Sequence, residues 1–337
     1  MKKYLLPKLN PYKANLHCHS TISDGELTPE EIKTEYMKKG YSAVAYTDHE
    51  VMVDHKDLCD ENFIALNGVE LEARTMGTNK RTHLCLIAKS QENRIVPCYN
   101  KSRYVWGRAE DYRDIQQYVT DDYIRSRTPE CVNDMIKRSK ELGYFVTFNH
   151  PAWSIEVYPE YSQYRGMDAI EVENHGSISD GFPDKSVHVY DDLLNLGVRL
   201  NAIAADDNHN HRPIGTPNQD SFGGWTVLFA ESLSYENLIS ALEKGNFYCS
   251  AGPDITELSI ENKTVQVKTS GAHRINLVTG NPNRHCENAT AFYGDVLHEA
   301  SFELRPDDVY FRIEVENDYG KTAYSNAFFL DSFDIEW

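Results

Sequence analysis

The chain has 337 residues, of which 40% are hydrophobic and 26% are charged, which is ordinary for a soluble globular protein. Asp and Glu number 52 against 34 Lys and Arg, giving a formal net charge of −18. This acid excess argues against a general binder of long nucleic acid or of an anionic membrane, because both need a net positive field. The chain also has 13 histidines, and 10 of them lie in residues 1–211.

Targeting and redox motifs are not visible in the sequence. The seven cysteines form no CxxC pair, so neither a zinc knuckle nor a redox motif is indicated. No apolar run approaches the ~18–20 residues of a membrane span. The apolar run before Pro7 is too short for a signal peptide. We therefore expect a reduced, cytoplasmic protein that makes no membrane contact.

Short apolar runs alternate with helix-like stretches over the first 250 residues. The runs that predict strands cover residues 14–18, 43–46, 64–69, 83–88, 145–148, 169–172, 200–205 and 226–229. Thr28-Pro29 predicts the start of a helix that ends near Gly40, and residues 130–142 show helical apolar spacing. This alternation indicates an α/β fold with a largely parallel sheet, whose active site lies at the C-terminal ends of the strands.

Residues 89–129 interrupt this rhythm with a stretch rich in Tyr, Arg and Asp. We interpret them as an insertion that forms a lid or substrate loop, with a plain surface excursion as the alternative. Three aromatic residues of the insertion could stack a nucleobase or simply pack the loop down: Tyr104, Trp106 and Tyr112.

The pattern changes again near residue 252. From there the chain alternates apolar and polar residues between Gly, Asn, Asp and Pro, which predicts a small antiparallel β-sandwich. We therefore expect a first domain over residues 1–252 and a β domain over residues 253–337. The three histidines of the β domain, His273, His285 and His298, are expected on its surface.

Histidines and carboxylates recur at the ends of the predicted strands. His17 and His19 lie two residues apart, so both side chains point to one face of a strand. Further candidate ligands follow at later strand ends: Asp24, His49, Glu70, His83, His150, Asp207 and His209. Imidazole and carboxylate ligands without thiolate suit Zn, Mn or Fe.

In sequence order, these motifs resemble those of the PHP (polymerase and histidinol phosphatase) domain, a superfamily of metal-dependent phosphoesterases. The motifs are H-C-H-S at 17–20, S-D-G at 23–25, T-D-H at 47–49, G-V-E at 68–70, H-L at 83–84, N-H-P at 149–151 and D-D-N-H at 206–209. The resemblance is strongest to two-domain members with a C-terminal β domain. It implies an α/β fold built on a distorted (β/α)7 barrel with two or three divalent metal ions.

The resemblance also implies how the ligands are shared. The first ion would be held by His17, His19, Glu70 and Asp207. Glu70 would bridge to a second ion with His83 and His150, and Asp24, His49 and His209 would hold a third. The sequence departs from the usual pattern at Asp206, an additional acid, and at Asp24, where other branches have His.

The implied reaction is hydrolysis of a phosphoester by a metal-activated hydroxide. A phosphate needs nearby cations, and the candidates for substrate binding are Arg74, Lys80, Arg81 and Arg212. Arg81 and Arg212 are also candidates for catalysis, each with a surface charge as the alternative. His175 follows another predicted strand and either protonates the leaving group or sits at the barrel mouth.

The predicted function is therefore a metal-dependent phosphoesterase. Its substrate would be a small anionic phosphorylated molecule, such as a nucleotide or an oligonucleotide end. One alternative is a hydrolase of the same architecture that acts on a carbamate or a carboxylic ester. A second is a binding module that has lost catalysis. The sequence leaves the oligomeric state open.

Overall fold

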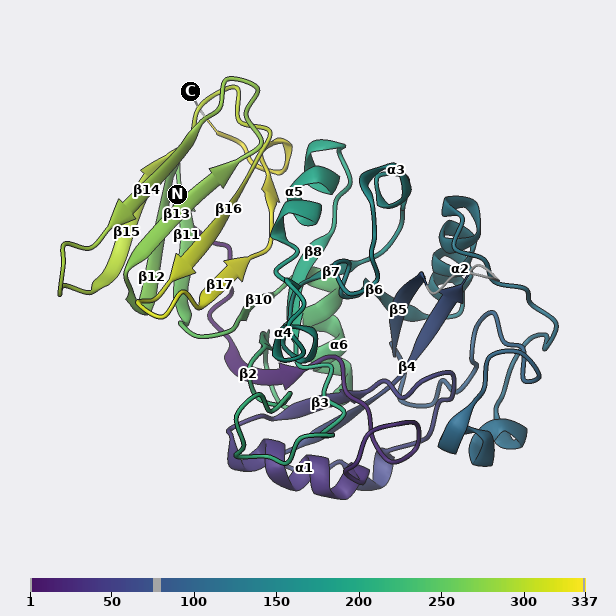
Figure 1. Cartoon of the computed structure of the whole chain (residues 1–337). Coiled ribbons are helices and arrows are strands. Elements are labelled where there is room, and N and C mark those ends of the chain that lie inside the picture. The colour runs from purple at the N-terminus through teal and green to yellow at the C-terminus, as the bar shows by residue number, and fades with distance from the viewer. Residues whose placement is uncertain (1, 75–79, 336) are drawn as a thin grey trace.

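One large mixed sheet and one smaller antiparallel sheet organise the chain (Figure 1). The structure is a computed structural model that describes residues 2–74, 80–335 and 337. The large sheet has the strand order β14-β13-β16-β17-β10-β9-β2-β3-β4-β5-β6-β7-β8, with β18 beside β16. The small sheet has the order β1-β11-β12-β15. The mixed α/β class predicted from the sequence is confirmed.

The elements have the following bounds. The strands up to residue 252 are β1 (Lys3–Tyr4), β2 (Asn10–Asn15), β3 (Ala43–Tyr46), β4 (Ile64–Arg74), β5 (Arg81–Ala88), β6 (Tyr144–Phe148), β7 (Ala169–Asn174), β8 (Asn201–Ala205), β9 (Trp225–Ala230) and β10 (Phe247–Ser250). The later strands are β11 (Ile255–Glu261), β12 (Thr264–Ala272), β13 (Arg274–Thr279), β14 (Cys286–Thr290), β15 (Leu297–Glu303), β16 (Tyr310–Glu316), β17 (Thr322–Ser325) and β18 (Phe328–Phe329). The helices are α1 (Pro29–Lys38), α2 (Pro129–Glu141), α3 (Tyr158–Tyr161), α4 (His175–Ser179), α5 (Val187–Asn195) and α6 (Tyr235–Lys244), with 3-10 helices η1 (Lys56–Leu58), η2 (Gly107–Ile115) and η3 (Leu330–Ser332).

Capping side chains fix where the two predicted helices begin. The Thr28 hydroxyl accepts a hydrogen bond from the amide of Glu31, and the Glu31 carboxylate accepts one from the amide of Thr28. This reciprocal pair is a capping box at the start of α1. The Thr128 hydroxyl caps α2 by accepting from the amide of Cys131. Both helices start within a residue of the predicted position.

The prediction of a largely parallel sheet is wrong at β5, and also at β9, which is antiparallel to β2. The pairs β2–β3, β3–β4, β6–β7 and β7–β8 are parallel, but β5 is antiparallel to both β4 and β6. β4 ends at Arg74 and β5 begins at Arg81. The connection between them is too short for a parallel crossover, which needs roughly a dozen residues. Glu70 and His83 therefore lie within adjacent antiparallel strands, and not at strand ends as the sequence suggested.

The large sheet bends so that β8 returns to the side of β9. The Thr226 hydroxyl on β9 donates to the carbonyl of Ala204 on β8 at 3.2 Å. Within the described ranges, no backbone ladder joins β8 to β9. The large mixed sheet is thus established, whereas the (β/α)7 barrel stays a prediction.

After residue 252, two sheets enclose a second apolar core. Strands from both sheets contribute to it, including Leu258 and Val267 on one side and Ile313 on the other. β1 pairs with β11, and β17 pairs with β10, so backbone ladders cross the predicted boundary at residues 252 and 253. His285 is an exception to the expected surface histidines, because it is buried with Nδ1 2.9 Å from both carboxylate oxygens of Asp308.

The predicted insertion, residues 89–129, packs beside β4 and the loop that follows β3. It contains η2 and an isolated bridge between Ile95 and Gln117. Among the described residues, no helix is long and apolar enough to cross a bilayer.

Candidate metal centre

Seven of the nine predicted metal ligands line one cavity of about 310 Å³. They are Asp24, His49, Glu70, His83, His150, Asp207 and His209. The other two, His17 and His19, are fully buried and contact Glu70 and Asp207 of the cavity wall. The structure therefore brings all nine residues together, from the loops after β2, β3, β6 and β8 and from β4 itself with its neighbour β5.

The first predicted ligand group has the spacing of a metal site. Nε2 of His17 and Nε2 of His19 lie 3.1 Å apart, and each is 3.1 Å from Oδ1 of Asp207. The Glu70 carboxylate oxygens lie 3.4 Å and 3.3 Å from these two nitrogens. Ligand atoms placed ~2.0–2.1 Å from a tetrahedral ion are about 3.4 Å apart. These four side chains thus leave room for one divalent ion.

Glu171, a residue that the sequence analysis missed, orients His17 from behind. Its Oε1 lies 3.1 Å from Nδ1 of His17, and both side chains are fully buried. Asn149 Nδ2 is also 2.9 Å from Nδ1 of His17. When Nε2 of His17 binds an ion, however, Nδ1 must carry the proton, so it cannot accept a hydrogen bond from the Asn149 amide. Only the Glu171 contact is then favourable, and it forms the carboxylate–histidine pair common behind metal ligands. A charged residue inside the apolar run 169–172 was the available clue.

The second predicted ligand group meets at one oxygen of Glu70. Nδ1 of His83 lies 2.8 Å and Nε2 of His150 lies 3.1 Å from Oε1 of Glu70. Nε2 of His83 is buried without a hydrogen-bond partner, although Oε2 of Glu72 is 3.5 Å away. A buried, unpartnered imidazole nitrogen is costly unless something binds it, and this one is the ring nitrogen that does not contact Glu70.

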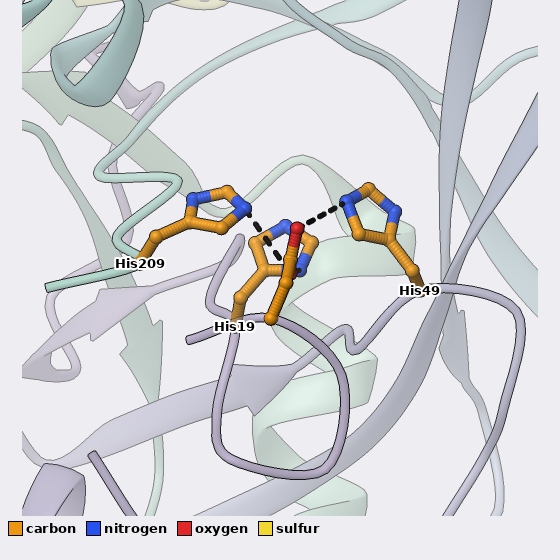
Figure 2. A group of neighbouring side chains, drawn as sticks. His19, His49 and His209 are labelled. Atoms are coloured by element: carbon orange, nitrogen blue, oxygen red, sulfur yellow. Dashed lines mark ion pairs between the residues drawn. The ribbon is translucent and has the colours of Figure 1, made fainter. Parts of the chain in front are cut away.

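The third predicted ligand group converges on Asp24. Nε2 of His209 lies 3.3 Å from Oδ1 of Asp24, and Nε2 of His49 lies 3.6 Å from Oδ2. Figure 2 shows His19, His49 and His209 pointing toward one another from separate parts of the chain. Nδ1 of His19 also belongs to this group, since it lies 3.6 Å from Asp24 and has no hydrogen-bond partner. His49 reaches toward the second group too, with Nδ1 3.0 Å from Oε2 of Glu70.

Mutual attraction between imidazoles and carboxylates shifts the pKa values across the cluster. Burial opposes protonation of His19, but hydrogen bonds and charges of Asp207 and Glu70 outweigh it and raise the pKa of His19 to about 10. Burial is outweighed in the same way at His83, where Glu70 and Glu72 raise the pKa to about 9. The surrounding imidazoles in turn lower the pKa of Asp207 against the effect of burial. At His49, by contrast, burial and the neighbouring His19 outweigh the carboxylates and lower the pKa to about 4.

Two buried aspartates hold the loops that carry the ligands. Asp48 accepts hydrogen bonds from the amides and hydroxyls of Ser20 and Ser23, which shapes the turn between His19 and Asp24. Asp206 accepts from the amides of residues 222–224 and from the Tyr36 hydroxyl, so the additional acid points away from the ligands. These contacts fix the loop ends.

Backbone strain is concentrated at the same place. Asp207 has φ of 52° and His150 has φ of 28°, in the left-handed region that non-glycine residues rarely adopt. Such strain persists only where the surroundings over-determine it, and it clusters at functional sites.

Of the four cations predicted to bind substrate, two line the cavity. Arg81 and Arg212 are part of its wall, whereas the cavity-lining residues do not include Arg74 or Lys80. Arg81 Nε lies 3.2 Å from Glu72, and Arg212 Nη2 lies 2.7 Å from Asp180. Both guanidinium groups are partly exposed and form an ion pair with these acids.

His175, predicted to protonate a leaving group, is placed outside the cavity wall. Its Nε2 is 3.1 Å from the carbonyl of Gln219, to which it donates, and its Nδ1 is buried without a partner. The start of α4 turns its ring toward residues 219–223, where a Cβ on Gly223 would collide with it. The described cavity wall instead contains His211 and two tryptophans, Trp106 of the insertion and Trp153.

Residues 15–133 match the family model of the PHP domain. This match confirms the predicted resemblance over the stretch that contains His17 to His83. The comparison with curated proteins finds no match.

Three solved structures are similar in fold. A two-domain protein from Bacteroides vulgatus, containing a predicted PHP-like metal-dependent phosphoesterase, is 17% identical, with 94% of each chain covered and a TM-score of 0.47. A candidate metal-dependent phosphoesterase from Bifidobacterium adolescentis is 14% identical, with 70% of this chain and 96% of that chain covered and a TM-score of 0.40. An amidohydrolase from Chromobacterium violaceum with bound sulfate and no metal is 18% identical, with 58% and 87% covered and a TM-score of 0.35.

Proposed function

We propose that the protein is a metal-dependent phosphoesterase that hydrolyses a small phosphorylated molecule, with a nucleotide or oligonucleotide end as the leading candidate. The observation that supports this most is the contact of one buried carboxylate, Glu70, with five imidazoles, those of His17, His19, His49, His83 and His150. The PHP match over residues 15–133 supports the same class. The proposal includes a distorted (β/α)7 barrel over residues 1–252 and a β-sandwich over residues 253–337.

The nine predicted ligands would hold two or three divalent ions, with Mn, Zn and Fe as candidates. The first group would comprise His17, His19, Glu70 and Asp207, and the second would add His83 and His150 to Glu70. Asp24, His49 and His209 would hold a third ion. When bound, such ions would act as Lewis acids and would lower the pKa of a water molecule toward neutrality.

The chain itself would supply orientation and charge around the ions. Glu171 would hold the His17 ring so that Nε2 faces the cavity. Arg81 and Arg212 would orient phosphoryl oxygens from the cavity wall, since a guanidinium donates two parallel hydrogen bonds. Among the described residues of the cavity wall, His211 is the histidine that is not a predicted ligand. Its Nε2 donates to the carbonyl of Asp24 at 3.0 Å. It is better placed than His175 to carry a proton.

One observation favours the carbamate or carboxylic ester alternative. Both cavity arginines are paired with acids, Glu72 and Asp180, so little uncompensated charge is left for a phosphate. The variants Arg81→Gln and Arg212→Gln separate the two functions. A phosphoesterase should lose most of its turnover, whereas an ester or carbamate hydrolase should keep it.

The main test is turnover with a broad panel of phosphoesters after reloading the protein with Mn, Zn or Fe. We expect phosphate release by the wild type and a loss of at least about 100-fold for Asp207→Asn, since this change removes an anionic ligand of the first group. Equal rates for the two proteins would refute the proposal. Fewer than two bound ions in the loaded wild type would favour the inactive binding module.

A further inference from the structure

We propose that the insertion, residues 89–129, acts as a clamp that sets Asp24 and His49 for the third ion, with Arg108 and Arg125 as the positioning residues. This inference rests on the proposed metal-dependent function, because it assigns a role toward one of the proposed ions. It concerns the insertion and not the ligands, which lie outside residues 89–129.

Arg108 grips the turn that carries Asp24. Its Nε donates to the carbonyl of Ser23 at 3.0 Å, and its Nη2 donates to the carbonyl of Gly25. These two carbonyls flank Asp24 on either side, so one guanidinium spans the backbone of the ligand. Within the turn, the Asp24 carboxylate accepts a hydrogen bond from the Ser23 hydroxyl at 3.2 Å. Backbone support from Arg108 therefore limits how far this carboxylate can move.

Arg125 grips the residue that follows His49. Its Nη1 lies 2.7 Å from both carboxylate oxygens of Glu50, and its side chain is fully buried. The Glu50 carboxylate also accepts from the amide of Glu72 at 3.0 Å, and Arg125 donates to the carbonyl of Glu72 at 3.2 Å. Glu50 has φ of 64°, so this ion pair holds a strained backbone directly beside His49.

Other contacts from the insertion reach the same segment. The amide of Met52 donates to Oε1 of Gln116 at 2.8 Å. The ring of Trp106 lies 5.6 Å from the ring of His49 and forms part of the cavity wall. Tyr104 stacks on Arg125 with its ring centroid 4.2 Å from the guanidinium carbon, and its hydroxyl accepts from the Arg125 amide. The insertion thus makes hydrogen bonds to both the turn that carries Asp24 and the loop that carries His49.

The first ligand group is held by different residues. Glu171 supports His17, and Asn174 Nδ2 donates to Oδ2 of Asp207 at 3.1 Å. Both supporting residues belong to β7, far from the insertion in sequence. Weakening the clamp should therefore reduce affinity for the third ion and leave the first in place.

The test measures metal content and affinity in the full-length protein, stripped with a chelator and titrated with Mn²⁺. The variants are Arg108→Gln and the double change Glu50→Gln with Arg125→Gln. Arg108 is half exposed, so its loss leaves no buried charge, and the double change removes both charges of the buried pair together. Arg113→Gln is the matched control, because Arg113 lies on the same insertion and is exposed to a similar degree.

We expect three Mn²⁺ per chain for the wild type and for the control. The two clamp variants should bind the third ion at least 10-fold more weakly, with the first unchanged and the thermal midpoint retained for Arg108→Gln. Three ions with wild-type affinity in both variants would overturn the clamp, as would an equal weakening of all three sites. A wild type that binds two ions would also overturn it while leaving the proposed function standing. Fewer than two ions would refute the proposed function itself.

Discussion

Replacing Glu171 with Gln tests whether the cluster is a metal site in which the Glu171 carboxylate orients the ligand His17. In the wild type, Oε1 of Glu171 faces Nδ1 of His17, and Oε2 accepts from the amide of His150 at 3.0 Å and from Nδ2 of Asn174 at 2.8 Å. A glutamine has one oxygen, so its NH2 group must face either the His17 ring or the two N–H donors. If the NH2 group faces the His17 ring, the tautomer of His17 that leaves Nε2 free to bind an ion is lost. If it faces the two N–H donors, a buried donor is left without an acceptor.

The expected cost follows from that geometry. Loss of a carboxylate behind a ligating histidine typically weakens metal binding by ~10- to 100-fold, which is about 1.4–2.8 kcal/mol. The assay is competition for Mn²⁺ or Zn²⁺ with a chelator of known affinity at neutral pH.

Glu173→Gln is the matched control for this experiment. Glu173 lies on the same strand, is equally buried, and has Oε2 without a hydrogen-bond partner. A β-bulge between Glu171 and Glu173 separates their environments, and lysines 185 and 321 are the charged groups near Glu173. We expect Glu173→Gln to bind metal like the wild type. Equal affinities for Glu171→Gln and the wild type would refute the role assigned to Glu171.

Three further predictions concern the loops and the protonation of the cluster. Gly25→Ala should displace Asp24 and cost about 1–3 kcal/mol of stability, because a Cβ would lie 2.4 Å from the carbonyl oxygen of His19. Chemical denaturation measures the loss of stability, and Mn²⁺ titration measures binding at the third site. Unchanged binding at the third site would contradict the prediction. Asp206→Ala should destabilise the fold by about 3 kcal/mol, since four donors lose their acceptor, and a urea midpoint equal to that of the wild type would contradict this. The raised pKa values of His19 (about 10) and His83 (about 9) stabilise the metal-free fold fully below pH 6.5, and this contribution is lost as pH rises through 9–10. The increase in Tm caused by Mn²⁺ should therefore grow between pH 7 and pH 9.5 in thermal scans with and without chelator, whereas a constant or shrinking increase would contradict the prediction.

The sequence was most informative where local chemistry decides the structure. Capping residues located α1, because Thr28 and Glu31 accept hydrogen bonds from each other's amides and Pro29 has no amide to satisfy, whatever surrounds the helix. The nine candidate ligands were also found in sequence, because histidine and carboxylate residues recur there after or within short apolar runs, where such residue types have few structural roles. The structure brings them together, and their roles as ligands stay predictions.

Long-range pairing was beyond the reach of the sequence pattern. The direction of β5 depends on how short the connection from β4 is, and an apolar run alone has no direction. Glu171 was missed because its importance comes from His17, which lies 154 residues earlier in the chain. The orientation of His175 was equally hidden, since the carbonyl of Gln219 that holds its ring belongs to a distant loop.

The pairing of β1 with β11 has a consequence for the order in which the chain can fold. Lys3 and Tyr4 lie opposite Ile260 and Ser259, so this ladder joins two segments that are far apart in the chain. Leu5 and Leu6 are buried in the core of the later sheets and gain their apolar neighbours there only when these segments meet. Closing so long a loop is entropically costly and slow, so this edge of the small sheet should be among the last parts to assemble.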